Sequence, residues 1–202
     1  ITQRQKVMVL EQAPLSDALF NGGGNGGVRG GTFTNRLIYD NHANGCGGAS
    51  IGSVTLTNCT VVDNSAGDKD GALDDPTISN TIFWNNSATN DGNQYRFVQP
   101  MNLYYCYSNN SGDVAGSGAF NPVACVTADP QFADPDGPDN IAGNADDDYH
   151  LQNTSLCIDA GENSFAQWRN GRFGDGNPRI ADRDDPPDGV ATVGIGAYEH
   201  QL

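Results

Sequence analysis

Acidic side chains are the residues of this sequence with the clearest capacity for chemistry. Seven Asp fall within residues 129–148, and the stretch 134–139 places carboxylates at alternate positions around Gly137. Oxygen ligands at short spacing suit Ca²⁺, and clustered like charges repel one another unless a cation screens them. We therefore expect a Ca²⁺ site built from Asp134, Asp136, Asp139, Asp146, Asp147 and Asp148.

A second acidic cluster follows near the end of the chain. Its candidate metal ligands are Asp182, Asp184, Asp185 and Asp188. The first cluster does not have the spacing of an EF-hand, because no Glu closes its loop and Pro138 occupies the third ligand position. A solvated acidic loop with proline turns is the alternative to a metal site.

Catalysis by paired carboxylates is a second chemistry to weigh. Asp40 and Asp63 occupy equivalent positions in two sequence repeats, 23 residues apart. Stacked repeats would bring them to roughly 5 Å, the separation of a retaining glycosidase pair. The third repeat carries Asn85 at that position, however, which favours a ladder of turn residues over a catalytic pair. We expect no catalysis here.

A lyase acting on acidic polysaccharide would need cations to bind uronates and a base to remove a proton. The cations of the repeats, Arg29, Arg36, Lys69 and Arg96, share no register. The histidines are scattered singly at positions 42, 150 and 200. Non-enzymatic function is therefore favoured, and a polysaccharide-active enzyme is the alternative.

Two aromatic residues could contact a carbohydrate. Tyr39 and Trp84 share a register that should face outwards, with Val62 between them. Exposed rings on such a face can stack on sugars, which would make the chain a carbohydrate-binding module. Cover of the strand by a loop is the interpretation that we favour.

Composition restricts the fold that positions these residues. The 202 residues include 25 acids and 10 bases, giving a net charge of −15, and 26 Gly, 10 Pro, 22 Asp and 22 Asn. These turn residues exclude a helical bundle and favour an all-β chain. The charge argues against nucleic acid or an anionic membrane as partner, and no apolar stretch approaches the length of a membrane span.

Cysteine usage bears on the compartment. The chain has five Cys and no CxxC motif, so a zinc site is not expected. Oxidised pairs would fit an extracellular location and leave one thiol over. The sequence does not fix the connectivity, although Cys106 and Cys125, which flank a Gly/Ser/Asn loop, are the preferred pair.

Internal repeats define the organisation of the chain. Three segments align without gaps and a weaker fourth follows them, at residues 35–41, 58–64, 80–86 and 104–110. A period of 22–24 residues containing several short strands is typical of a β-solenoid. We expect one inward stack of Phe33, Leu56 and Ile78, and another of Ile38, Val61, Phe83 and Tyr107.

Asparagines recur at the ends of the aligned segments. We expect two ladders of stacked side-chain amides at turns, the first with Asn35, Asn58 and Asn80, the second with Asn41, Asn64, Asn86 and Asn110. Asn suits such positions because its amide can hydrogen-bond along the stack and because it tolerates turn conformations.

The repeats and the second half of the chain carry a resemblance. A Gly-Gly-Ala motif followed by an apolar-x-x-Asn box, as in 38–41, 61–64 and 83–86, resembles the repeats of polymorphic outer-membrane proteins. The ordered segments 129–132, 134–139, 147–151, 155–161, 176–179 and 194–199 resemble the C-terminal module of choice-of-anchor proteins. The resemblance implies a right-handed parallel β-helix at a bacterial surface, and no agreed activity.

Three regions follow from this interpretation. Residues 1–25 hold a strand and a Gly/Asn loop, residues 26–128 the β-helix coils, and residues 129–202 an Asp-rich module that caps the open end. We expect a secreted or cell-surface structural or adhesive protein that is stabilised by Ca²⁺. Its expected partners are copies of itself, in an oligomer or filament formed through residues 1–25, or cell-surface components.

Overall fold

The protein is described by a computed structural model in which almost all regular structure is β-strand. The structure describes residues 28–69, 73–74, 77–90, 95–97, 101–104, 107–108, 114–116, 120–142, 146–166, 180–181 and 189–198. The predicted N-terminal region, residues 1–25, lies outside this part. Among the described residues, the only helical element is the short 3-10 helix η2 (Asn163–Phe165).

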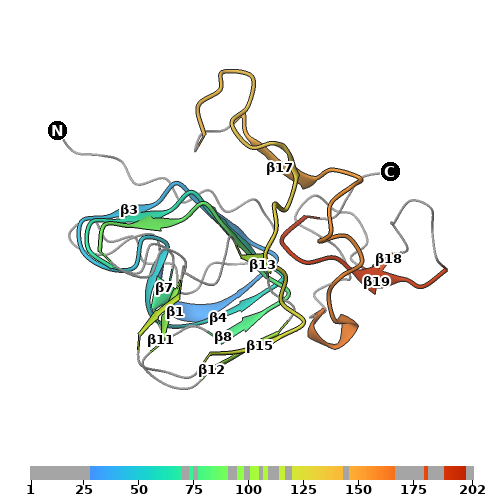
Figure 1. Cartoon of the computed structure of the whole chain (residues 1–202), viewed down its shortest axis with the longest axis horizontal. Helices are drawn as coiled ribbons and strands as arrows, with labels where there is room; N and C mark the ends of the chain where they lie inside the picture. The colour runs from blue at the N-terminus through green and yellow to red at the C-terminus, as the bar shows by residue number, and fades with distance from the viewer. Residues whose placement is uncertain are drawn as a thin grey trace.

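The repeats contribute strands to three parallel sheets. The first contains β1 (Val28–Thr34), β4 (Ser50–Thr57), β7 (Leu73–Asp74), β8 (Thr77–Ser79), β11 (Tyr95–Phe97), β12 (Met101–Tyr104), β14 (Val114–Gly116) and β15 (Phe120–Val123). The second contains β2 (Leu37–Tyr39), β5 (Thr60–Val62), β9 (Ile82–Trp84) and β13 (Tyr107–Ser108). The third contains β3 (His42–Ala43), β6 (Ser65–Ala66) and β10 (Ser87–Ala88). Figure 1 shows strands of successive repeats lying over one another along the three sides of a common outline.

Corners between these short strands are made by Asn and Asp in the left-handed conformation. Each strand of the second sheet up to β9 has such a residue on either side. Their φ angles are 56° at Asn35, 49° at Asp40, 52° at Asn58, 55° at Asp63, 46° at Asn80 and 52° at Asn85. Among residues with a side chain, Asn and Asp accept this conformation most readily. The repeated Asn and Asp therefore limit each of these strands to three residues.

The inward side chains stack as the repeats predict. Phe33 pairs with Leu56 and Leu56 with Ile78, and in the second sheet Ile38 pairs with Val61 and Val61 with Phe83. All six are buried in one apolar cluster. At about 25 cal/mol per Å² of buried apolar surface, such stacking is the main stabilising contribution to the repeats.

The fourth repeat differs from its predicted register by one residue. Tyr107 pairs with Ile82, and Ser108 takes the place opposite Phe83 that was predicted for Tyr107. In the first sheet, 25 residues separate Ile78 from its partner Leu103, against 22 between Leu56 and Ile78. Strand pairing sets the register here, because connections between strands tolerate extra residues. Asn110 lies outside the described residues.

One member of the preferred cysteine pair, Cys106, lies outside the described residues, whereas Cys46, Cys59, Cys125 and Cys157 lie within them. The Cys125 thiol donates to the carbonyl oxygen of Leu103 at 3.6 Å, as the Cys59 thiol does to that of Phe33 at 3.5 Å. Both cysteines therefore serve as small corner residues whose thiols satisfy backbone carbonyls.

The C-terminal module, meaning the described residues from 129 onwards, lies beside the repeats. It includes β16 (Phe132–Asp134), β17 (Asp148–Leu151), β18 (Ile180–Ala181) and β19 (Thr192–Val193). Figure 1 shows it outside the outline of the repeats, next to the second sheet. The sequence predicted that this module covers an end of the stack, whereas its described residues pack against the side. Apolar residues on the outer face of the second sheet explain this position.

Candidate functional site

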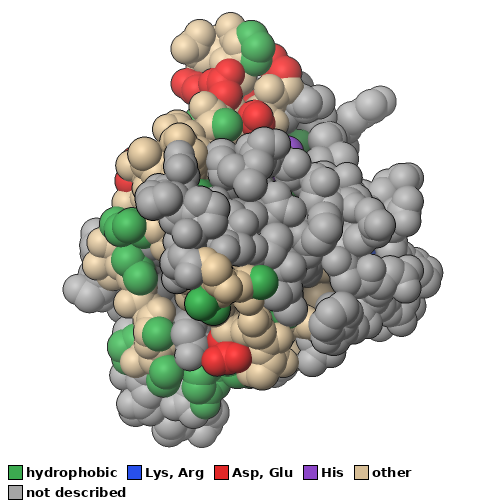
Figure 2. Space-filling view, turned by 90° about the vertical axis from the view of Figure 1, so that its right-hand side faces the viewer, with side chains coloured by type: hydrophobic (Ala, Val, Ile, Leu, Met, Phe, Trp, Pro, Cys, Tyr) green, Lys and Arg blue, Asp and Glu red, His purple; other side chains and the backbone are tan. Residues whose placement is uncertain are grey.

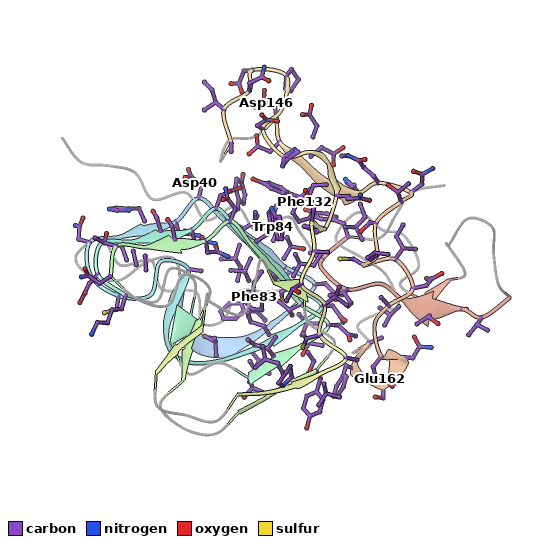
Figure 3. The ribbon with its side chains drawn as sticks, in the orientation of Figure 1. Asp40, Phe83, Trp84, Phe132, Asp146 and Glu162 are labelled. Atoms are coloured by element: carbon purple, nitrogen blue, oxygen red, sulfur yellow. The ribbon has the colours of Figure 1, made fainter. Side chains whose placement is uncertain are left out.

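The outer face of the second sheet is apolar and aromatic, and the C-terminal module covers it. Tyr39, Val62 and Trp84 stand in one row across β2, β5 and β9. Figure 3 shows Trp84 directed towards Phe132 of the module, while Phe83 points into the repeats. Tyr39 is 2 % exposed. Tyr39 and Val62 are therefore covered, as the sequence favoured, whereas Trp84 is half-buried.

Aromatic contacts hold the module against this face. The ring of Tyr149, on β17, lies 5.7 Å from that of Tyr39 and 5.4 Å from that of Phe132 in an edge-to-face arrangement. Edge-to-face ring pairs add about 0.5–1.5 kcal/mol beyond the area that they bury. Tyr149 is thus the central side chain of the interface.

The hydroxyl of Tyr149 reaches two carboxylates. It lies 3.1 Å from Oδ2 of Asp63 and 3.3 Å from Oδ2 of Asp147, and Asn85 donates to Oδ1 of Asp63. A phenol has one proton to donate, so it cannot donate to both carboxylates at once. No pattern in the sequence indicates this cluster, because Tyr149 and Asp63 are 86 residues apart.

Burial raises the pKa of Asp63 above its ordinary value of 3.8, and the charges of Asp147 and Asp40 raise it further. Hydrogen bonds from Asn85 and Tyr149 act in the opposite direction. Burial also raises the pKa of Tyr149, as do the charges of Asp63 and Asp147. A carboxyl group whose pKa is raised in this way is the kind that can act as a general acid.

We expect Asp63→Asn to stabilise the protein at neutral pH. Because the pKa of Asp63 is raised on folding, the stability that this carboxyl contributes is fully present below its unfolded pKa, near 3.8, and is lost as pH rises through the folded pKa. Asn at this position has no charge to bury and tolerates positive φ. The Tm of Asp63→Asn should exceed that of the wild type at pH 7, with the difference shrinking towards pH 4.

Asp40→Asn is the matched control for this comparison. Asp40 has the same register and the same backbone conformation, but it is exposed. The Tm of Asp40→Asn should follow that of the wild type between pH 4 and pH 7. A small difference is expected because this variant removes one of the charges that raise the pKa of Asp63. Equal responses of the two variants would contradict burial as the cause.

The predicted Ca²⁺ ligands of the first cluster gather on one projecting hairpin. Asp134 of β16 and Asp148 of β17 are antiparallel partners. Desolvation by neighbouring atoms, followed by the negative charges of Asp136, Asp148 and Asp146, raises the pKa of Asp134, whose side chain is exposed. The loop closes at Gly137 (φ +60°), where a Cβ would lie 2.9 Å from the carbonyl oxygen of Asp146. Figure 2 shows acidic side chains collected on this projection.

Several of the six predicted ligands have other contacts, Asp148 among them through its bonds to His150. Oδ1 of Asp139 accepts the backbone N–H of Ile141 at 2.9 Å, and Oδ2 of Asp147 lies against Tyr149. The other predicted ligands, Asp182, Asp184, Asp185 and Asp188, lie outside the described residues. Within the described ranges, no three His, Cys, Asp or Glu side chains are arranged to hold a metal ion.

A histidine that the sequence left without a role lies beside this hairpin. Nδ1 of His150 is 2.6 Å from Oδ1 of Asp148, and its ring lies 4.6 Å from that of Tyr198. The carboxylate orients the imidazole, and the tyrosine ring covers one of its faces. Asp148 is therefore shared between the acidic hairpin and the body of the module.

Backbone contacts join the module to the corners of the repeats. Nδ2 of Asn80 donates to the carbonyl oxygen of Glu162 at 3.1 Å, and the N–H of Glu162 returns a bond to Oδ1 of Asn80 at 3.0 Å. The N–H of Ala197 donates to Oγ1 of Thr60 at 3.0 Å. Asn80 thus belongs both to the predicted ladder, through its bond to Asn58, and to this interface.

Comparison with known proteins finds no matching family model, no matching curated protein and no matching solved structure. In the part of the chain that the structure describes, no helix has the length and apolar character needed to cross a bilayer.

Proposed function

We propose that this chain is a structural module of a secreted or cell-surface protein, built as a right-handed parallel β-helix. Support for the helix comes from three parallel sheets visited in the same order by successive repeats. Parallel strands joined by a crossover are right-handed in about 98 % of cases. The resemblance to polymorphic outer-membrane and choice-of-anchor proteins supports a bacterial surface location.

One observation carries the non-enzymatic role: the aromatic row of the second sheet, where a sugar could stack, is covered by the chain's own C-terminal module. Ladder and core contacts account for the other recurrent features of the repeats, since they stabilise the stack. Such a surface suits a spacer or an adhesive module that presents its ends or edges to partners.

Two measurements test this role. The purified chain should release no reducing ends or unsaturated products from a panel of neutral and uronic polysaccharides. In cells of the source organism, protease added to intact cells should degrade the protein, or the protein should be found in the medium. Cleavage of any polysaccharide, or protection in intact cells until lysis, would contradict the proposal.

A polysaccharide-active enzyme is the second candidate, and the raised pKa of Asp63 favours it. A glycosidase needs one carboxyl group that stays protonated as the acid and a second as nucleophile or base. Asp63 would be the acid, with Asp40 or Asp147 as its partner. Activity that disappears in Asp63→Asn and persists in a surface variant such as Asn90→Ala would establish this function.

We also propose that Ca²⁺ binds the acidic hairpin, supported by the negative charges of Asp136, Asp146 and Asp148 that act on Asp134. Ca²⁺ should raise the Tm and chelator should lower it, because a ligand that binds only the folded state adds about 2.7 kcal/mol at 100 times its Kd. The double variant Asp134→Asn/Asp136→Asn should lose this response, while Asp40→Asn should keep it. Equal Tm values with Ca²⁺ and with chelator would refute Ca²⁺ binding.

A further inference from the structure

A proline follows an aspartate at the point where the acidic hairpin turns. Asp134 ends β16, and Pro135 opens the turn of residues 135–140. The peptide bond before a proline is a tertiary amide, so its nitrogen carries no N–H and leaves as a secondary amine when the bond breaks. Asp134 is exposed and Pro135 half-exposed, on a hairpin that projects from the body of the protein (Figure 1). Water therefore reaches the Asp134–Pro135 bond.

The turn holds the carbonyl group of this bond. The N–H of Gly137 donates to the carbonyl oxygen of Asp134 at 3.3 Å. Gly137 has φ +60°, and a Cβ there would lie 2.9 Å from the carbonyl oxygen of Asp146, so the backbone at this donor is closely packed. A fixed N–H at a carbonyl oxygen stabilises the negative charge that develops when a nucleophile attacks the carbonyl carbon. The turn thus supplies an oxyanion donor to the Asp134–Pro135 bond.

The nucleophile for this bond is the side chain of the same aspartate. Attack by an Oδ of Asp134 on its own carbonyl carbon closes a five-membered ring, so the two groups are held close together by the residue itself. The carboxyl group of Asp136 forms a side-chain hydrogen bond with that of Asp134. Such a bond requires a proton between the two groups, because an ionised carboxylate only accepts. Asp136 can therefore take the proton of Asp134 and pass it to the nitrogen of Pro135.

We propose that the protein cleaves its own chain at the Asp134–Pro135 bond. Asp136 takes the proton of the Asp134 carboxyl, and the freed Oδ attacks the Asp134 carbonyl carbon to form a C–O bond. The C–N bond breaks, its electron pair stays on the nitrogen of Pro135, and Asp136 returns the proton there. Water then opens the resulting cyclic anhydride to two carboxyl groups, and the net reaction is hydrolysis of one peptide bond.

A second Asp–Pro bond, Asp129–Pro130, is held differently. Oδ1 of Asp129 accepts the N–H of Gln131 at 2.8 Å. Pro130 is buried, and its carbonyl oxygen accepts the hydroxyl of Ser155 at 2.6 Å. The Asp129 carboxylate would have to give up its bond to the turn before it could attack. The folded chain therefore favours cleavage after Asp134 over cleavage after Asp129.

Cleavage would divide the hairpin without unfolding it. Phe132 pairs with Leu151, and Asp134 with Asp148, across the cut. The ring contacts of Tyr149 hold β17 against the repeats. The two fragments should therefore stay together in the native protein and separate in denaturant. Self-cleavage goes beyond the structural role proposed above, and an intact chain would leave that role unaffected.

Mass spectrometry of the purified full chain, incubated in buffer with chelator, tests the proposal. Chelator is present because Ca²⁺ on the same carboxylates would displace the shared proton. In the folded wild type, cleavage after Asp134 should be at least tenfold faster than cleavage after Asp129, at a rate that does not depend on protein concentration. In denaturant this difference should disappear, because the two bonds then join the same residue types without the turn.

Two variants test the role of Asp136. Asp136→Asn should slow cleavage after Asp134 about a hundredfold, since acid–base catalysis by one positioned side chain contributes about 10²–10⁴-fold. Asp136→Glu keeps a carboxyl group and should recover most of the rate.

Three results would overturn the inference. The first is an intact wild-type chain, and the second is an equal rate after Asp134 in folded and denatured protein. The third is an Asp136→Asn variant that cleaves as fast as the wild type or as fast as Asp136→Glu. The first two need no variant, so the proposal can fail even if a substitution disturbs folding.

Discussion

Asn64→Ala is expected to destabilise the protein by about 3–5 kcal/mol, since removing one partner of a buried hydrogen bond costs about 1–3 kcal/mol for each group left unsatisfied. The side chain is fully buried. It donates to the carbonyl oxygens of Ile38 and Val62, and it accepts both donors of Asn41. Denaturant unfolding measures the loss, and the Tm should fall by roughly 10 °C.

Asn90→Ala is the control for this variant. Asn90 also bonds to the preceding repeat, through Nδ2 to Oδ1 of Asp68 at 2.7 Å, but on an exposed corner. Surface substitutions of this kind change stability by about 0.5 kcal/mol or less. A loss at Asn64 no larger than the loss at Asn90 would show that the buried ladder contributes little to stability.

Gly196→Ala should separate the C-terminal module from the repeats at a cost of roughly 2–5 kcal/mol, combining backbone strain and overpacking. Gly196 has φ +112°, and a Cβ there would lie 2.7 Å from Cδ1 of Ile82 and 3.1 Å from Oγ1 of Thr60. Its N–H donates to the carbonyl oxygen of Asn80 at 3.0 Å. Unfolding should begin at lower denaturant concentration, with increased exposure of the aromatic row.

Two comparisons separate strain from packing. Gly189→Ala is a matched control, because Gly189 also has positive φ (+86°) but no atom within 4 Å of the added Cβ. It should lose only the backbone component, about 1–2 kcal/mol. Ile82→Val removes Cδ1 and should recover part of the loss when combined with Gly196→Ala. Without such recovery, contact with Ile82 is not the cause.

The sequence was sufficient to predict the stacking of the first three repeats, because these repeats obey the same local rule. An Asn or Asp at each corner fixes the strand length, so inward positions such as Ile38, Val61 and Phe83 align from spacing alone. The rule fails at Tyr107, where one additional residue between strands displaces the register. The predicted register came from the number of residues between repeats. The observed register depends on hydrogen bonds between strands, which that number does not reveal.

The position of the module could not be predicted in the same way. Contacts between Tyr149 and Asp63, or between Glu162 and Asn80, join residues more than 80 positions apart. In neither contact does a periodic pattern in the sequence link the two residues. The outward row of Tyr39, Val62 and Trp84 did indicate that something covers this face, and the acidic hairpin was recognisable as a cluster.

The lateral position of the module has a consequence for how the repeats can change in number. A bare stack of repeats gains or loses a unit at modest cost, because each unit contacts only its neighbours. Here Thr60 and Asn80, which lie in successive repeats, are both bonded to one continuous segment, since Gly196 and Ala197 are adjacent. A repeat inserted between them would pull these anchor points apart by one strand spacing, about 4.8 Å. The segment of the module that contains Gly196 and Ala197 therefore fits a fixed spacing of the repeats. Insertion of a repeat between Thr60 and Asn80 requires a matching extension of that segment.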